Sequence, residues 1–260
     1  MSSSAALESC VGFALNDIFK LGFKRMEIAL MGQQVEHNYI GVKCGIMDQF
    51  ISCLGEKGKL LQLDCRSLKY EEFPFHPKGY RLVLINTGVS HMLGNPYNKR
   101  RESCERVVAE IAKKNPKVKF LRDANMTMLK AVKDKVNPID YMRAEFVIEE
   151  ISRLKRACSA LKKDDYETVG RMMYGTHEGL SKKYWVSCEE LDFLNMMAKS
   201  CGVTGSRVMG GGFGGCTINL VKNSLYDSFI KKTLAAYKNE YGIDAKVYDV
   251  VIGDGARKLE

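Results

Sequence analysis

The spacing of apolar residues changes in blocks along this chain, and the order of the blocks limits the folds open to it. A helical period near the start gives way to strand patterns, returns over a long central stretch, and ends in strands and one helix. The expected helices cover residues 3–19, 24–40, 97–114, 125–134, 138–162, 165–182, 188–200 and 224–241. The expected strands lie near 60–63 and 73–75, and at 81–87, 206–209, 216–221 and 246–252. Strands and helices in separate runs favour an α+β fold with a layered sheet.

Composition excludes several classes of protein. With 260 residues, 45% of them hydrophobic, the chain can fill one large domain or two modest ones. Charges interrupt every apolar stretch, and the first residues lack a secretory signal, so we expect a cytoplasmic protein with no membrane partner. Nine cysteines without a Cys-x-x-Cys pair fit reduced thiols. The net charge of +9 comes from basic residues interleaved with acids, so we expect no nucleic-acid partner.

Three segments place unusual residue types where chemistry could use them, and the first is the serine run at the start of the chain. Ser2, Ser3 and Ser4 open the first expected helix. Hydroxyls and free backbone N–H groups at a helix N-terminus, with the positive end of the dipole, can bind an anion. Ordinary N-capping of the helix is the alternative.

The second segment, 41–50, reads Gly-Val-Lys-Cys-Gly-Ile-Met-Asp-Gln-Phe. Asp48 follows a glycine turn, where a carboxylate can face a cleft and take a proton from a hydroxyl. It could equally cap the short helix that follows. Glu36, twelve residues earlier on the polar side of a helix, would suit a hard cation together with a hydroxyl oxygen. His37 beside it is expected to form a hydrogen bond at the helix end rather than bind a metal.

The third segment is a loop of five glycines around Phe213, at 210–215 between two expected strands. Its backbone can approach a ligand closely, and its N–H groups can converge on negative charge. A merely flexible turn is the alternative. The sequence contains no P-loop and no dinucleotide fingerprint after a strand, which excludes ordinary P-loop NTPases and Rossmann enzymes.

Taken in order, the serine run, the hexapeptide Cys-Gly-Ile-Met-Asp-Gln (44–49) and the glycine loop resemble the second and third signature motifs of the GHMP small-molecule kinases, and of the galactokinase group in particular. Segments 86–104, 186–192 and 251–257 also look like galactokinase stretches. The resemblance implies the GHMP kinase fold. It places a remnant of the N-terminal, ribosomal-protein-S5-domain-2-like ATP-binding domain at 1–76. A ferredoxin-like α+β C-terminal domain with extra helices would follow at 77–260.

The resemblance also implies a reaction, the ATP-dependent phosphorylation of galactose at its anomeric hydroxyl. Asp48 would be catalytic, as a general base or as an electrostatic aid, and Gly45 and Tyr97 would contact the sugar with it. Ser4 and Glu36 would hold Mg²⁺. The residues that would bind ATP are Ser2, Ser3, Ser4, Ala5, Gly211 and Gly212. We expect a monomer.

The sequence departs from the family in one large respect. Family members have a strand and a glycine before the serine run, and earlier an Arg-x-Asn-x-x-Gly-Glu-His-Thr-Asp-Tyr motif that grips the sugar, and neither is present. The chain therefore resembles an N-terminally truncated kinase, and such a truncation can impair activity. Two alternatives stay open: a kinase for N-acetylgalactosamine or another hexose, and a non-catalytic sensor of sugar and ATP.

Overall fold

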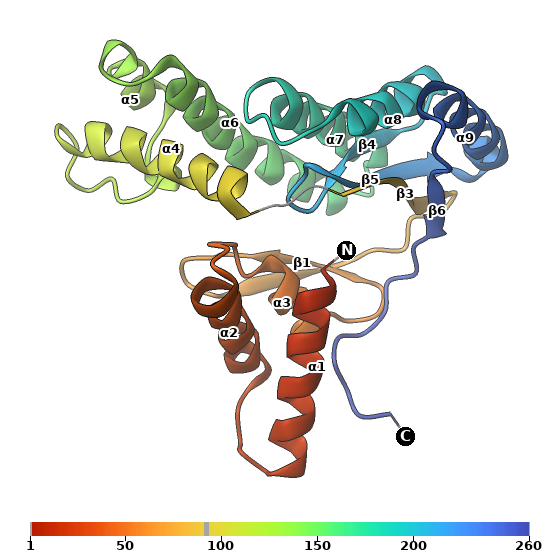
Figure 1. Ribbon diagram of the computed structural model, residues 1–260, viewed down its shortest axis with the longest axis horizontal. Helices are drawn as coiled ribbons and strands as arrows, with labels where there is room; N and C mark the ends of the chain where they lie inside the picture. Colours follow the sequence, from red (N-terminus) through yellow and green to blue (C-terminus); the bar gives the residue numbers. More distant parts are fainter. Residues whose placement is uncertain (1, 91–93, 260) are drawn as a thin grey trace. The chain divides into compact units, whose positions relative to one another are not determined.

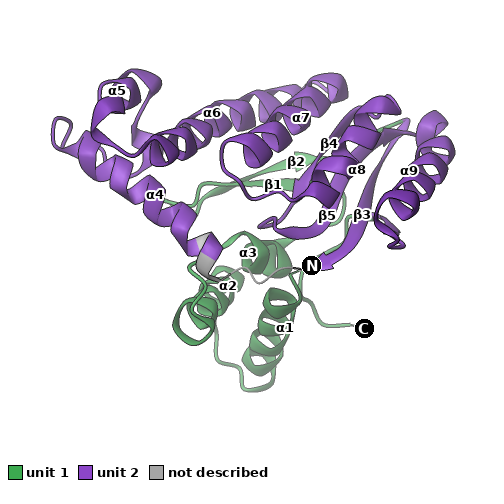
Figure 2. Cartoon of the chain, turned by 45° about the horizontal axis from the view of Figure 1, so that its top comes forward, with its two compact units in different colours: residues 1–78, 251–260 green, residues 79–250 purple. Residues whose placement is uncertain are grey.

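The computed structural model describes residues 2–90 and 94–259, and the chain divides into two compact units (Figure 2). Unit 1 is Met1–Lys78 with Val251–Glu260, and unit 2 is Gly79–Val250. The elements of unit 1 are α1 (Ser3–Ile18), α2 (Arg25–Val35), the π-helix η1 (Glu36–Ile40), α3 (Met47–Leu54), β1 (Lys59–Leu63) and β2 (Tyr70–Pro74). The elements of unit 2 are β3 (Tyr80–Ser90), α4 (Gly94–Ala112), η2 (Leu121–Asp123), α5 (Met126–Lys130), η3 (Lys133–Lys135), α6 (Pro138–Leu161), α7 (Tyr166–Lys182), α8 (Glu189–Ser200), β4 (Gly205–Met209), β5 (Gly214–Lys222), η4 (Asn223–Leu225), α9 (Tyr226–Tyr241) and β6 (Lys246–Asp249).

Unit 1 packs three helices around a small apolar core, beside the antiparallel pair β1 and β2. The buried core residues are Ile28, Ala29, Ile46, Phe50 and Cys53. The C-terminal tail joins this unit through its backbone: Gly255 N donates to Gly55 O, and Ala256 N donates to Ser52 O, each at 2.7 Å. The tail therefore closes the C-terminal end of α3.

The described strands of unit 2 form an antiparallel sheet in the order β4-β5-β3-β6, and α7, α8 and α9 lie along one face of it (Figure 1). The core between sheet and helices contains Val83, Ile85, Leu194, Ala198, Val203, Val221, Phe229 and Tyr237. One close approach needs a glycine, because a Cβ on Gly170 of α7 would lie 2.0 Å from the carbonyl oxygen of Thr204.

A second apolar cluster of unit 2 forms where α4, α5 and α6 meet. Its buried members are Val107, Ile111, Val118, Leu121, Leu129, Val132 and Ala144. Side-chain caps explain where the long helices begin. Pro138 is the first residue of α6, and the side chain of Asn137 before it accepts a hydrogen bond from Ile139 N. The side chain of Asp165 caps α7 in the same way, by accepting from Thr168 N.

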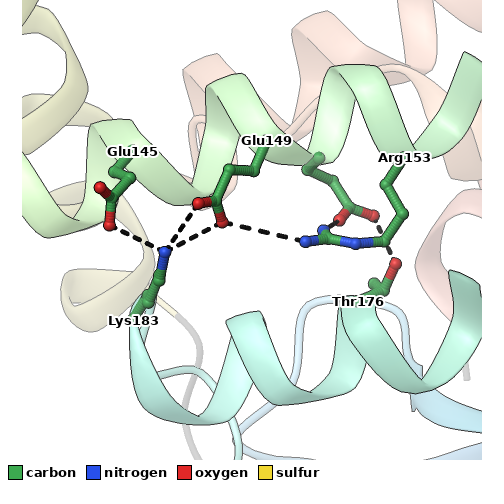
Figure 3. Close-up of polar contacts among 6 residues, drawn as sticks. Glu145, Glu149, Arg153, Thr176 and Lys183 are labelled. Carbon is green, nitrogen blue, oxygen red and sulfur yellow. Dashed lines mark hydrogen bonds and ion pairs between the residues drawn. The ribbon is translucent and has the colours of Figure 1, made fainter. Parts of the chain in front are cut away.

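A ladder of charged and polar side chains joins α6 to α7 (Figure 3). Its members on α6 are Glu145, Glu149, Glu150 and Arg153. Thr176 lies within α7, and Lys183 directly follows its last residue. Lys183 Nζ lies 2.8 Å from Glu145 and 2.9 Å from Glu149. Single pairs at this partial exposure stabilise little. Lys183 and Thr176 are the members that link α7 to α6.

The predicted α+β class is confirmed, and the elements differ from expectation in three places. The expected helix 24–40 changes from an α-helix to a π-helix at Glu36. The expected helix 125–134 is two short turns, α5 and η3, since Leu129 and Val132 reach the same cluster without a continuous helix. The expected strand 246–252 ends at Asp249, and the residues beyond Val250 belong to unit 1. The domain boundary after residue 76 stays a prediction.

All nine cysteines are free, as their spacing predicted. Among the described helices, none has both the length and the apolar character needed to cross a membrane.

Candidate functional site

The serine run meets a carboxylate from a distant part of unit 1. Ser4 Oγ donates to Glu36 Oε1 at 2.6 Å. Ser2 stands at the N-cap position with φ 38°, and its side chain makes no capping hydrogen bond within the described residues. Capping by Ser2 is therefore not observed. Ser2 and Ser3 are exposed, and Ala5 is buried, so any contact of Ala5 with a ligand would come from its backbone.

Glu36 begins the π-helical turn η1, which follows α2 without a break and ends at Gly41 with φ 79°. Single π-helical turns are rare, and they occur frequently at functional sites. Glu36 is only 9% exposed. A carboxylate has about four acceptor positions, and the hydroxyl of Ser4 occupies one of them. The remaining oxygen capacity can serve a cation.

The loop before α3 is tied back to the preceding helices through the carbonyl oxygen of Cys44. Gln33 Nε2 donates to this oxygen at 3.2 Å, and His37 Nε2 lies 2.8 Å from it. The expected role of His37 as a hydrogen-bonding residue at the helix end is confirmed. These contacts fix the segment that contains Gly45, which is exposed and has open space where a Cβ would stand.

Asp48 lies in the first turn of α3. The N-cap position belongs to Ile46 and shows no side-chain capping bond, so Asp48 does not cap this helix. Its carboxylate is half-buried, and among the described residues none forms a hydrogen bond or ion pair with it. The positive end of the helix dipole attracts its negative charge. Asp48 thus remains available to a ligand.

The charges of three carboxylates act on the thiol of Cys44. Burial raises the pKa of Cys44, and the negative charges of Glu36, Asp48 and Glu8 raise it further. Burial also raises the pKa of Glu8, with a contribution from the charge of Glu36, while a hydrogen bond from Gln49 opposes the rise. Glu8 was not predicted as a site residue. Its place one helical turn beyond the serines, on the same face of α1, was the signal that could have found it.

Ser4 and Glu36 provide the type of ligand that Mg²⁺ prefers. This ion usually takes one or two carboxylates and completes its shell with water and substrate phosphates. In the described part of the chain, no group of three or more His, Cys, Asp or Glu side chains could hold a metal ion alone. The residues therefore fit a magnesium ion that nucleotide phosphates help to hold.

The glycine loop of unit 2 adopts a backbone conformation in which most residues have positive φ. The residues with positive φ are Gly210, Gly212, Phe213, Gly214 and Gly215. Phe213 N donates to the carbonyl oxygen of Val186 at 2.7 Å. A Cβ on Gly212 would lie 2.0 Å from the same oxygen. The loop therefore needs glycine at position 212 because the backbone of Val186 lies against it, whether or not a ligand binds there.

The predicted site residues divide between the two units: unit 1 contains Ser2, Ser3, Ser4, Ala5, Glu36, Gly45 and Asp48, and unit 2 contains Tyr97, Gly211 and Gly212. The structure brings Ser4 and Glu36 into direct contact. Tyr97 belongs to α4 by its backbone, and its side chain lies outside the described part of the chain.

Comparison with known proteins covers the whole chain. The family model of the GHMP kinases N terminal domain matches residues 1–56, and the model of the GHMP kinases C terminal matches residues 157–239. Galactokinase of Thermotoga petrophila is 35% identical over 100% of this chain and 72% of its own length. Galactokinase of Clostridium beijerinckii is 40% identical over 100% of this chain and 67% of its own length.

Solved structures give the same result. The crystal structure of Lactococcus lactis galactokinase complexed with galactose matches with a TM-score of 0.92 and 34% identity, over 99% of this chain and 67% of that one. Mevalonate kinase of L. major, solved with R-mevalonate, matches with a TM-score of 0.59 and 19% identity over 98% of this chain and 67% of its own. That second likeness shows the fold alone.

Proposed function

Because the chain belongs to the galactokinase family of the GHMP kinases, and is thereby a kinase, we propose that it transfers the γ-phosphate of ATP to the anomeric hydroxyl of galactose. The products are galactose 1-phosphate and ADP. The observation that carries the proposal is that unit 1 contains the Ser4–Glu36 pair and, acting on the same Cys44 thiol as Glu36, the carboxylate of Asp48, with which no described residue forms a hydrogen bond or ion pair.

Asp48 acts on the sugar hydroxyl. It either accepts the proton as the anomeric oxygen attacks the γ-phosphorus, or attracts that proton and orients the oxygen. The bond from the γ-phosphorus to its bridging oxygen breaks, and ADP leaves. Phosphoryl transfer asks mainly for positioning and charge neutralisation. A carboxylate in the first turn of α3 that forms no hydrogen bond or ion pair with the described residues suits the first of these tasks.

The serine run binds the phosphates of ATP. The first N–H groups of α1, from Ser3, Ser4 and Ala5, have no acceptor within the helix, and the helix dipole favours an anion there. Ser2 and Ser3 add exposed hydroxyls. Bound Mg²⁺ would neutralise negative charge on the phosphates, and Ser4 and Glu36 would hold it.

The remaining assignments follow the family resemblance. The backbone of Gly211 and Gly212 contacts the nucleotide, and Gly45 and Tyr97 contact galactose. The protein is a cytoplasmic monomer, and its nine free thiols support a reducing compartment.

The test is release of ADP by the purified chain with Mg-ATP and galactose, N-acetylgalactosamine or no sugar. Galactose-dependent release supports the proposal. Stronger release with N-acetylgalactosamine would assign a different hexose. Binding of Mg-ATP and galactose without turnover would contradict catalysis and favour a sensor.

A further inference from the structure

The connector 183–188 between α7 and α8 supports the glycine loop 210–215. The carbonyl oxygen of Val186 accepts the hydrogen bond of Phe213 N, and it lies where a side chain on Gly212 would stand. Val186 is 4% exposed. This one carbonyl group therefore limits where the loop can lie.

Arg100 of α4 holds one side of the connector. Its Nε donates to Tyr184 O at 3.2 Å, and its Nη2 donates to Trp185 O. The same guanidinium lies over the ring of Phe213, 5.1 Å from its centroid. One side chain thus contacts both the connector and the glycine loop.

Asp192 in the first turn of α8 holds the other side. Ser187 Oγ donates to Oδ1 at 2.6 Å, Ser181 Oγ donates to Oδ2 at 2.7 Å, and His177 Nε2 lies 3.1 Å from Oδ1. Burial opposes ionisation of this carboxyl, but the hydrogen bonds from His177, Ser187 and Ser181 outweigh it and lower the pKa of Asp192 to about 2. Of these three donors, only Ser187 belongs to the connector.

We propose that Asp192, acting through Ser187, is a positioning residue that holds the connector under the glycine loop and so keeps the loop ready to bind a nucleotide phosphate. The inference rests on the proposed function in one respect, the binding of nucleotide by this loop.

The loop needs such a support for a physical reason. Glycine-rich segments lose much conformational entropy when they become ordered, and Phe213 with φ 59° adopts a backbone conformation that a bulky residue rarely takes. Such conformations persist only where the surroundings over-determine them. A loop held in place before the nucleotide arrives avoids paying the ordering cost at binding.

The chain offers a matched pair of variants for the test. Ser187→Ala removes the bond from the connector to Asp192, and Ser181→Ala removes a bond of similar length, 2.7 Å against 2.6 Å, from α7 to the same carboxylate. Ser187→Thr keeps the hydroxyl. A hydrogen bond to a charged group stabilises enough that losing it should raise KM for Mg-ATP about tenfold in Ser187→Ala. We expect kcat and KM for galactose to stay within about twofold of the original values.

Trp185 gives a readout that does not depend on activity. It is the only tryptophan of the chain, it lies in the connector, and its indole N–H donates to Lys182 O at 3.0 Å. We expect Ser187→Ala to change the emission of Trp185 and its quenching by iodide. Ser181→Ala should lower the melting temperature by about as much as Ser187→Ala does, but leave KM for Mg-ATP and the emission of Trp185 within error of the original protein. Ser187→Thr should restore the original KM for Mg-ATP and the original emission.

The two proposals fail in different ways. Equal effects of Ser187→Ala and Ser181→Ala on KM for Mg-ATP, in a chain that phosphorylates galactose, would overturn the positioning role and leave the kinase reaction intact. A different result would overturn the proposed reaction and support the positioning role. The chain would bind Mg-ADP, its affinity for Mg-ADP would fall about tenfold in Ser187→Ala, and it would phosphorylate no sugar. A chain that binds no Mg-ADP contradicts both.

Discussion

The serine run and hexapeptide of unit 1 differ from the glycine loop of unit 2 in how far the protein satisfies its own polar groups. In unit 1 the carboxylate of Asp48 has no hydrogen-bonding partner among the described residues, and Glu36 keeps acceptor capacity beyond its bond to Ser4. In unit 2 the groups that hold the glycine loop, Arg100 and Asp192, each bond to several protein atoms. The first arrangement leaves chemistry for a ligand, and the second holds a backbone in place.

The contrast has a consequence for substitution. Groups that bind a ligand act on turnover and add little to folding, because the folded protein alone does not satisfy them. Groups that hold a backbone act on stability first and on substrate affinity second. Substitutions in the two regions should therefore separate by which quantity they change.

The largest effect is expected at Asp48. Asp48→Ala should lower kcat by about 10³-fold, within the range that general acid–base residues contribute, and leave the melting temperature unchanged. Turnover with galactose and thermal unfolding measure the two quantities. Asp17→Ala, at an exposed acid of α1, is the control. Undiminished turnover in Asp48→Ala would remove this residue from the mechanism.

A smaller effect on activity is expected at Glu36. Glu36→Gln keeps an acceptor for Ser4 and removes the charge. Loss of an outer-shell partner costs up to about 100-fold in metal affinity, so weakening a direct ligand should raise the Mg²⁺ concentration for half-maximal turnover by at least about 100-fold. Titration of activity with MgCl₂ measures it. Glu8→Gln removes a neighbouring charge that is not assigned to the ion, and it should shift the midpoint less. The reverse order would place the cation at Glu8.

In unit 2 the expected change is in stability. Gly212→Ala places a Cβ 2.0 Å from the carbonyl oxygen of Val186, so the backbone must move, and the free energy of unfolding should fall by at least about 3 kcal/mol. Gly210 has a similar φ, 78°, but no atom lies within 4 Å of where its Cβ would stand. Gly210→Ala should therefore lower the free energy of unfolding by about 1–2 kcal/mol. Urea unfolding compares them, and equal losses would show that the connector does not press on the loop.

The smallest effect concerns pH. Asp192 has a pKa of about 2 in the folded chain, below its ordinary value of 3.8. A lowered folded pKa contributes stability that is present above the unfolded pKa and is lost as pH falls through the folded one. Asp192→Asn should therefore be less stable than the original chain by about 1–2 kcal/mol near neutral pH, and the difference should shrink between about pH 4 and pH 2. Urea midpoints at several pH values test this, and a constant difference would contradict it.

Much of the fold could be predicted from the sequence, because local signals agreed with the final structure. Asn137 with Pro138 and Asp165 begin helices where their residue types favour it. The prediction failed for 125–134, because Leu129 and Val132 have the spacing of a helix, but Leu129 reaches the core from α5 and Val132 from the link between α5 and η3. Apolar spacing reports which side chains are buried, and it does not report whether one continuous helix presents them.

The candidate site was predictable only where a motif marked it. Ser4 and Asp48 stand in motifs, and Glu36 lies on the helix before the second motif, whereas Glu8 has a partner far away in the sequence. The pair Glu8 and Gln49 is 41 residues apart, and no local pattern announces it.

The sequence by itself determined the class of fold, the family, and the residue types that phosphoryl transfer needs. Each of these depends on short segments whose residue types and spacing can be recognised without the structure. Only the tertiary structure decided that Ser4 bonds to Glu36, that no described residue forms a hydrogen bond or ion pair with the carboxylate of Asp48, and that Gly212 is required by the backbone of Val186. Hydrogen bonds and steric contacts act over a few ångströms in space, and the residues that make them are brought that close only when the chain folds.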